Sequence, residues 1–232
     1  MKKQIYGLLA VFIIATLLVL PIYGADTEIS RHYQNTGFTA VSIASGMRLE
    51  VKQGTPYEVV VRTEENQLKQ VKVAQVGNML HFYLPPFSLA TTPVEISIIM
   101  PELTKIDLSG GSKAHVTMKV LPKSFGASLS GGAELSGLLH AQRLELNLSG
   151  GSVSNLTGAA DTLIVRASGG SRILQDSFKV DRARINLSGG CRSEVFVIES
   201  MDVDASGGSQ IYYHGTPKLN TSFSGGAGIR SF

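Results

Sequence analysis

Cysteine, tryptophan and charged residues are scarce in this sequence, which has one Cys, no Trp and 17% charged residues among 232. A single cysteine, Cys191, excludes a disulfide within the chain. The hydrophobic content of 43% is high enough to form a sizeable core, so disorder is not expected. Glycine is abundant instead, with 25 residues against 8 prolines, and this balance indicates many turns rather than many helices.

The amino terminus has the residue order of a secretory signal peptide. Two lysines precede an uncharged run from Ile5 to Leu20, and Pro21 and Gly24 follow. We therefore expect residues 1–24 to be a signal peptide and the remaining chain to be exported to the periplasm, the cell surface or the medium. The alternative is an uncleaved anchor, because a run of this length can span a bilayer. Membrane contact is expected only through this leader.

Basic residues are not in excess once the leader is set aside. Residues 1–24 hold two of the 21 Lys and Arg residues and none of the 18 Asp and Glu residues, so the rest of the chain has a formal charge of +1. It contains no row of basic residues with interleaved aromatics, which a nucleic-acid surface would need. We therefore expect no nucleic-acid partner.

The triplet Ser-Gly-Gly occurs seven times at nearly regular intervals of 18 to 21 residues, and such a period indicates a repeat architecture. The serines of the triplets are Ser109, Ser130, Ser149, Ser168, Ser188, Ser206 and Ser224. The residue after each Gly-Gly pair is always small. Cys191 occupies this position in the fifth triplet, so we interpret it as a serine-sized filler of a turn rather than a reactive thiol.

The residues before each triplet alternate between apolar and polar side chains. Positions one, three and five before the serine are mostly apolar, whereas the position two before it is mostly polar. Alternation with period two indicates a strand with one face inside and one face outside. The polar position, which we call the outward row, is occupied by Asp107, Ser128, Asn147, Arg166, Asn186, Asp204 and Ser222.

A strand, a tight Gly-Gly turn and a second extended stretch, repeated at this period, fit the coils of a parallel β-solenoid. Each coil would bury its apolar face by stacking on its neighbours. Leucine-rich repeats and calcium-loaded β-rolls are disfavoured, because the units L-x-x-L-x-L-x-x-N and G-G-x-G-x-D do not recur. We therefore predict an all-β fold with coils of about 18 to 21 residues marked by Ser-Gly-Gly corners.

Residues 37–103, upstream of the first triplet, keep the strand pattern without the triplet, and Ser45-Gly46 is a candidate for a degenerate first corner. We expect this segment to form the first coils or capping strands, because a solenoid with a bare apolar end would aggregate. The predicted organisation is a signal peptide at 1–24, a linker at 25–36 and one domain at 37–232, with the repeats at 104–232.

Several segments of this domain resemble a known family. They read GFTAVSIASGMRLEVKQGTPYEVVVRTEENQLKQVKV, VGNMLHFYL and IIMPELTKIDLSGGSKAHV, followed by the repeat AELSGLLHAQRLELNLSGG. Over about residues 37–232 the chain is similar to the GIN domain, the head domain of bacterial auto-transporter adhesins, a family of unknown function. The resemblance implies a right-handed parallel β-helix in an exported protein.

Catalytic and metal-binding constellations are not evident. A polysaccharide-active enzyme needs clustered carboxylates, whereas Asp107 and Asp204 of the outward row are five strand steps apart. Seven equivalent serines cannot each have a catalytic base, and the five histidines lack the spacing of a metal site. We therefore expect no enzymatic activity, no metal and no cofactor.

The residues that suit a binding role are polar or aromatic. Asn147, Arg166 and Asn186 of the outward row are candidates for contacts with a ligand. Tyr212 and Tyr213 are consecutive, so one of the two faces outward in a strand, where its ring can stack on a sugar.

We hypothesise an exported, non-catalytic, adhesin-like module of the cell envelope that binds cell-surface glycans or envelope proteins. The alternative is a structural envelope component that self-associates end to end. A polysaccharide-active β-helix enzyme is the third interpretation.

Overall fold

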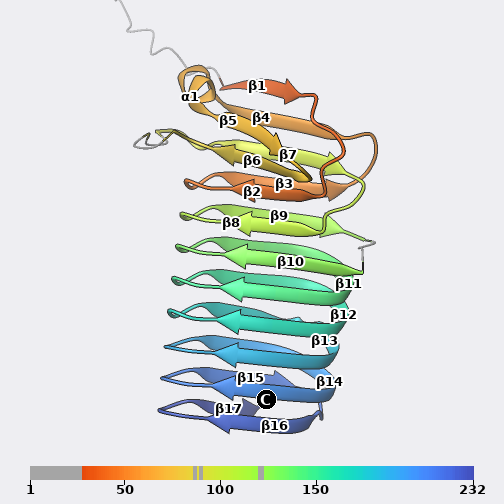
Figure 1. Cartoon of the computed structure of the whole chain (residues 1–232), viewed down its shortest axis with the longest axis vertical. Coiled ribbons are helices and arrows are strands. Elements are labelled where there is room, and N and C mark those ends of the chain that lie inside the picture. Colours follow the sequence, from red (N-terminus) through yellow and green to blue (C-terminus); the bar gives the residue numbers. More distant parts are fainter. Residues whose placement is uncertain (1–27, 86–87, 89–90, 120–122) are drawn as a thin grey trace, which may run out of the picture.

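The computed structural model describes residues 28–85, 88, 91–119 and 123–232 (Figure 1). The predicted signal peptide at 1–24 lies outside the described residues. Within this part of the chain the fold is nearly all-β, with a single short helix, α1 (Glu65–Gln70). No helix in the described ranges is long and apolar enough to cross a bilayer.

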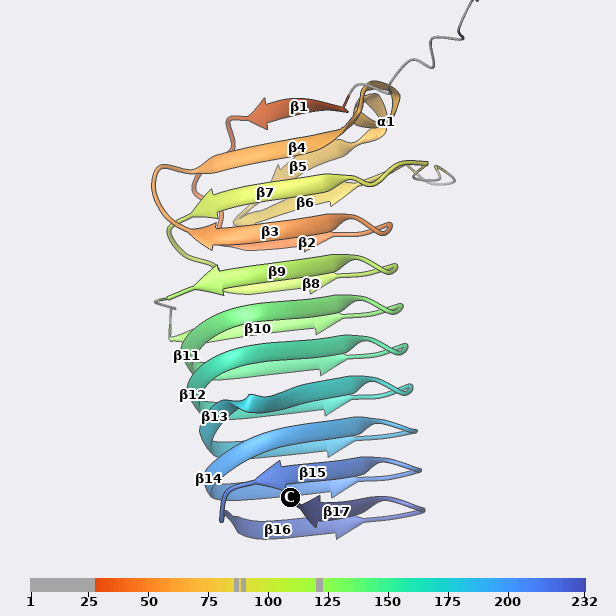
Figure 2. The same ribbon diagram turned by 180° about the vertical axis from the view of Figure 1, so that it is seen from behind.

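The strands form a flattened β-solenoid with two broad faces, which confirms the predicted fold class (Figures 1 and 2). The first face, toward the viewer in Figure 1, contains in spatial order β5 (Lys72–Val76), β6 (Met79–Tyr83), β2 (Ala40–Ile43), β8 (Lys105–Leu108), β10 (Ser124–Leu129), the carboxyl-terminal parts of β11 (Glu134–Leu148), β12 (Val153–Ala167), β13 (Arg172–Leu187) and β14 (Arg192–Ala205), and β16 (Lys218–Phe223).

The second face, toward the viewer in Figure 2, is built in the same way. It contains β1 (Glu28–Tyr33), β4 (Glu58–Glu64), β7 (Glu95–Met100), β3 (Arg48–Gln53), β9 (Lys113–Met118), the amino-terminal parts of β11 to β14, β15 (Gln210–His214) and β17 (Gly228–Ser231). The long strands β11 to β14 bend from the second face round to the first, so each contributes to both. The right-handed winding stays a prediction.

Neighbouring coils pair in parallel, so equivalent residues of successive repeats stack directly. On the first face Leu144 of β11 pairs with Leu163 of β12, and Leu146 pairs with Val165. The apolar positions predicted to point inward are buried in the successive coils, namely Ile106, Ala127, Leu146, Val165, Ile185 and Val203. The alternation in the sequence therefore gave the correct inside and outside faces.

Each Ser-Gly-Gly triplet lies in the turn that leads from the first face to the second. In five of these turns the small residue after the glycines is buried, and its side chain donates a hydrogen bond to the carbonyl of the triplet's serine. Cys191 does so through its Sγ, 3.2 Å from the carbonyl oxygen of Ser188, whereas Ser171 uses its hydroxyl at 2.8 Å from Ser168. Cys191 thus takes the place of a serine in the turn.

The segment 37–103 contains both a coil and capping strands. Strands β2 and β3 pair in parallel with β8 and β9 on one side and with β6 and β7 on the other. Residues 40–53 therefore form a coil that lies between β6–β7 and β8–β9, although both of these segments come later in the sequence. Ser45 and Gly46 make its turn with φ values of 62° and 74°.

Antiparallel strands close the amino-terminal end of the solenoid. β5 pairs with β6, β4 pairs with β7, and β1 pairs with β4. β1 lies within residues 25–36, for which a linker was predicted. It is ordered as a strand because Ile29 and Tyr33 pack against the core while its backbone pairs with β4.

Candidate ligand-binding groove

The outward row lines a shallow groove along the first face, with a volume of about 660 Å³. Its lining consists of Ser42, the row from Asp107 to Asp204, the triplet serines from Ser109 to Ser206, and the apolar residues between these two rows, Leu108, Leu129, Leu148, Ala167 and Leu187. The first-face strands from β8 to β13 each contribute the same three positions, because the coils stack in register. The groove is therefore a direct product of the sequence period.

The structure places Asn147, Arg166 and Asn186 side by side in this groove. Arg166 pairs with Asn147 on one neighbouring strand and with Asn186 on the other. Since adjacent strands are about 4.8 Å apart, the three side chains form one continuous polar surface. Asp204 and the triplet serines were not among the predicted site residues, although their shared period is the signal that would have included them.

Charge is distributed unevenly along the groove. Asp107 accepts a hydrogen bond from Lys105 at 2.8 Å through Oδ2, and its Oδ1 is buried with no hydrogen-bond partner among the described residues. The side chains of Arg166 and Asp204 make no hydrogen bond or ion pair with any residue that the structure describes. Arg166 therefore leaves an uncompensated positive charge near the middle of the groove.

Tyr212 and Tyr213 lie on the second face, in β15, and do not share a site with Arg166. The Tyr212 ring has the guanidinium of Arg192 4.5 Å from its centroid and the ring of Phe232 at 5.5 Å. Tyr213 packs against the core. Both tyrosines are half-buried, and Tyr212 belongs to an aromatic cluster that also contains His214, stacked on Phe232 at 4.5 Å.

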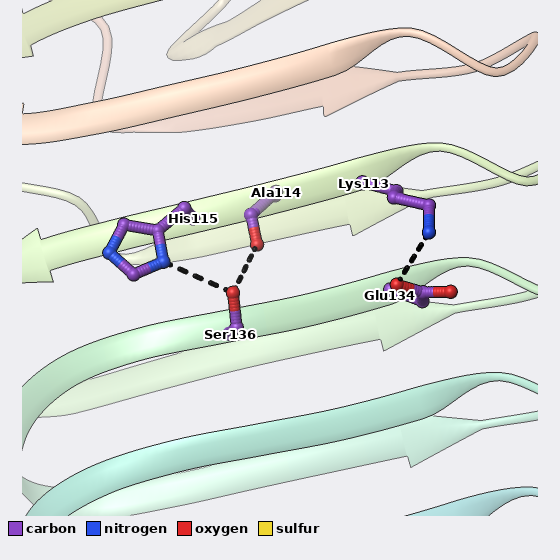
Figure 3. Close-up of polar contacts among 5 residues, drawn as sticks. All are labelled: Lys113, Ala114, His115, Glu134 and Ser136. Atoms are coloured by element: carbon purple, nitrogen blue, oxygen red, sulfur yellow. Dashed lines mark hydrogen bonds and ion pairs between the residues drawn. The ribbon is translucent and has the colours of Figure 1, made fainter.

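A second, smaller groove of about 370 Å³ lies on the second face, over β9, β11 and their neighbours. Figure 3 shows the polar contacts among five of its lining residues. The Ser136 hydroxyl lies 3.1 Å from Nδ1 of His115 and 3.4 Å from the Ala114 carbonyl oxygen, to which it donates. Lys113 forms an ion pair with Glu134 at 2.9 Å. No carboxylate among the described residues hydrogen-bonds to His115, so the pair lacks the orienting third group of a nucleophilic triad.

Metal ligands do not gather on either face. Within residues 28–85, 91–119 and 123–232, no group of three or more His, Cys, Asp or Glu side chains is placed to hold a metal ion. The chemistry that the first groove offers is hydrogen bonding by hydroxyls and amides, together with the guanidinium of Arg166 and the carboxylates of Asp107 and Asp204.

A family model described as "Putative auto-transporter adhesin, head GIN domain" matches residues 37–217 of the chain. A comparison with curated proteins finds no match. The family match begins after β1 and covers the other capping strands and the stacked coils up to the end of β15.

Solved structures share the fold at low sequence identity. A protein from Bacteroides fragilis called a putative adhesin is 18% identical, with a TM-score of 0.79, over 90% of this chain and 98% of that chain. A putative lipid binding protein from Parabacteroides distasonis is 16% identical, with a TM-score of 0.74 and the same coverage. A putative adhesin from Parabacteroides merdae is 14% identical, with a TM-score of 0.71. At these identities the likeness shows the fold alone.

Proposed function

We propose, from the premise that this chain belongs to the family of auto-transporter adhesin head GIN domains, that it is a non-catalytic binding module of the cell envelope whose groove holds a glycan. Membership of an adhesin family supports an exported or cell-surface protein with a binding role. The periplasm, the outer surface and the medium are all compatible with the predicted leader.

The observation that carries the glycan proposal is the groove on the first face. It presents one hydroxyl, amide or charged side chain from each coil, with a parallel line of serines beside it. A glycan offers hydroxyl groups at regular intervals, and these both donate and accept hydrogen bonds. A flat, regular polar surface suits an extended chain better than a compact ligand.

A lipid tail fits this groove less well. The structural relative from P. distasonis carries a lipid-binding description, but here Leu129, Leu148 and Leu187, which line the groove, are almost fully buried. An acyl chain would therefore meet polar side chains at each coil, which gives little hydrophobic gain.

The test is binding of the purified protein to an array of bacterial and host glycans and peptidoglycan, with product analysis of each hit. We expect saturable binding without cleavage. The double variant Arg166→Ala/Asn186→Ala should weaken binding by at least about tenfold, the scale of losing one or two hydrogen bonds to a charged or amide group.

The matched control is Asn155→Ala/Arg172→Ala, which removes the same residue types from exposed positions of β12 and β13 on the second face. It should bind like the wild type. Unchanged affinity in the Arg166/Asn186 variant would rule out this groove as the site, and cleaved product would rule out a non-catalytic role.

A second candidate function is end-to-end assembly, which the open carboxyl-terminal end favours. Leu219 and Phe223 occupy inward positions of the last described coil, yet each is 38% exposed, because no further coil among the described residues covers them. β16 and β17 also have no strand on their outer edges within the described residues. Unpaired edges with apolar side chains are the usual template for strand addition.

A further inference from the structure

The arginines of the first face differ in whether they have a carboxylate partner. Arg143 bonds to Glu145 at 2.6 Å, Arg182 to Glu199 at 3.1 Å, and Arg184 lies 3.6 Å from Asp202. Arg166, in the same region of the same face, pairs with no carboxylate in the described part of the chain. Among the arginines described on this face, Arg166 is the one whose charge no carboxylate neutralises.

The neighbours of Arg166 explain why it stays unpaired. The residues beside it on the adjacent strands are Asn147 and Asn186, whose amides carry no charge. The residue two positions earlier on its own strand, Ile164, is apolar and largely buried. By contrast, Arg184 has Asp202 as its direct cross-strand partner. The guanidinium therefore has an uncharged amide beside it on each adjacent strand and an apolar residue two positions earlier on its own strand.

A carboxylate is the chemical group that suits this arrangement. A guanidinium binds a carboxylate through two parallel N–H···O bonds, and such charge-assisted pairs are stronger than neutral hydrogen bonds. The side chains of Asn147 and Asn186 make no hydrogen bond with the described residues, so their amide N–H groups are available on both sides of the guanidinium.

The acids of the groove limit how much negative charge the ligand can carry. Asp204 is two strands from Arg166 and Asp107 is three strands away on the other side, which corresponds to roughly 10 and 14 Å. A polyanion with a charge on every unit would face repulsion at both acids. A sugar hydroxyl at these places would instead donate a hydrogen bond to the carboxylate.

We infer that the ligand of this groove is an acidic glycan in which a carboxylate-bearing sugar, seated on Arg166 between Asn147 and Asn186, is flanked by neutral sugars. The inference rests on the proposed function, since it specifies the chemical class of the glycan that the groove holds. Terminal sialic acids and internal uronic acids both supply such a carboxylate.

The experiment compares each acidic glycan with a neutral counterpart by calorimetry or biolayer interferometry on the purified protein. One pair is sialyllactose and lactose, which tests a terminal acid. The other is a hyaluronan octasaccharide and its carboxyl methyl ester, which tests an internal acid with neutral neighbours. Wild type should bind at least one acidic member about tenfold or more tighter than its neutral partner, and the preference should shrink with added salt.

The variant Arg166→Gln should lower affinity for the acidic member to that of the neutral one. Arg143→Gln, which removes an arginine that already pairs with Glu145 outside the groove, should keep the preference. Equal binding of acidic and neutral members by wild type would overturn the inference and leave the proposed function standing. Absence of binding to these four probes and to every glycan of the array would overturn both.

Discussion

At the scale of single residues, the two glycines of one triplet meet different surroundings. A Cβ on Gly169 would lie 3.1 Å from the backbone nitrogen of Gly150 in the preceding turn, whereas a Cβ on Gly170 would have no atom within 4 Å. Both residues have positive φ, 67° and 81°. The first glycine is therefore needed for stacking as well as for the turn, and the second only for the turn.

We predict that Gly169→Ala destabilises the protein more than Gly170→Ala. Both variants lose about 1 to 2 kcal/mol because an alanine is forced to positive φ. Gly169→Ala costs more because two stacked backbones must also separate. Urea denaturation of both variants measures the difference, and equal losses would show that the turns do not stack as described.

At the scale of elements, coils of unequal length absorb their extra residues away from the triplet turns. β13 pairs Gln175 with Val195 and then Lys179 with Phe196, so it holds three extra residues there. β14 holds one extra residue between Val197 and Ser200. These irregularities account for the change of triplet spacing from 20 to 18, and the turns remain in register because their backbones stack.

The buried Gln175 is part of this irregular stretch. Its amide donates to the Ser154 hydroxyl at 2.9 Å and accepts from the Leu156 backbone N–H at 3.3 Å. A polar side chain inside the core is tolerated here because it is hydrogen-bonded on both sides. The extra residues of unequal coils are therefore accommodated in this irregular stretch of the strands and not in the stacked Ser-Gly-Gly turns.

Stability should decrease toward the last coil. β12 and β13 have a coil on both sides, whereas β16 and β17 pair on one edge and all six residues of β16 are exposed. In a stacked repeat each coil is stabilised by its neighbours, so a coil with one neighbour opens at lower free energy. Native-state hydrogen exchange should show the slowest backbone amides in β12 and β13 and the fastest in β16 and β17. Uniform protection along the solenoid would contradict this gradient.

At the scale of the whole molecule, the two ends of the solenoid are finished differently. Antiparallel strands and α1 close the amino-terminal end, while the last coil leaves Leu219 and Phe223 partly exposed (Figure 1). The two faces also differ, since the larger groove lies on the first and the aromatic cluster on the second. An end-to-end contact would leave both faces accessible.

If the open end mediates self-association, charge placed there should abolish it. We expect the average mass of the wild type in light scattering to rise with concentration, and Leu219→Lys/Phe223→Lys to remain monomeric because burying two ammonium groups is unfavourable. Ile198→Lys, at an exposed apolar position on the side of β14, serves as the control and should associate like wild type. A wild type that stays monomeric at high concentration would remove the assembly proposal.

The sequence by itself determined the repeating part of this protein. The triplet period, the alternation before each triplet and the small residue after it predicted the strands, the buried residues such as Ile185 and the role of Cys191. It also brought Asn147, Arg166 and Asn186 to one outward row. These features are predictable because in a solenoid each residue contacts its equivalent one coil away, so a local pattern repeated in the sequence specifies the tertiary contacts.

The parts of the fold that do not follow the sequence repeat were decided only by the tertiary structure. The β2–β3 coil lies between segments that follow it in the chain, and β1 pairs with β4 although a linker was predicted there. Arg166 has no carboxylate partner among the described residues, whereas Arg184 pairs with Asp202. Such contacts join segments with no shared pattern, and they depend on which strands compete best for each free edge across the whole chain. The charge that defines the proposed ligand is therefore a property of the folded face rather than of the repeat.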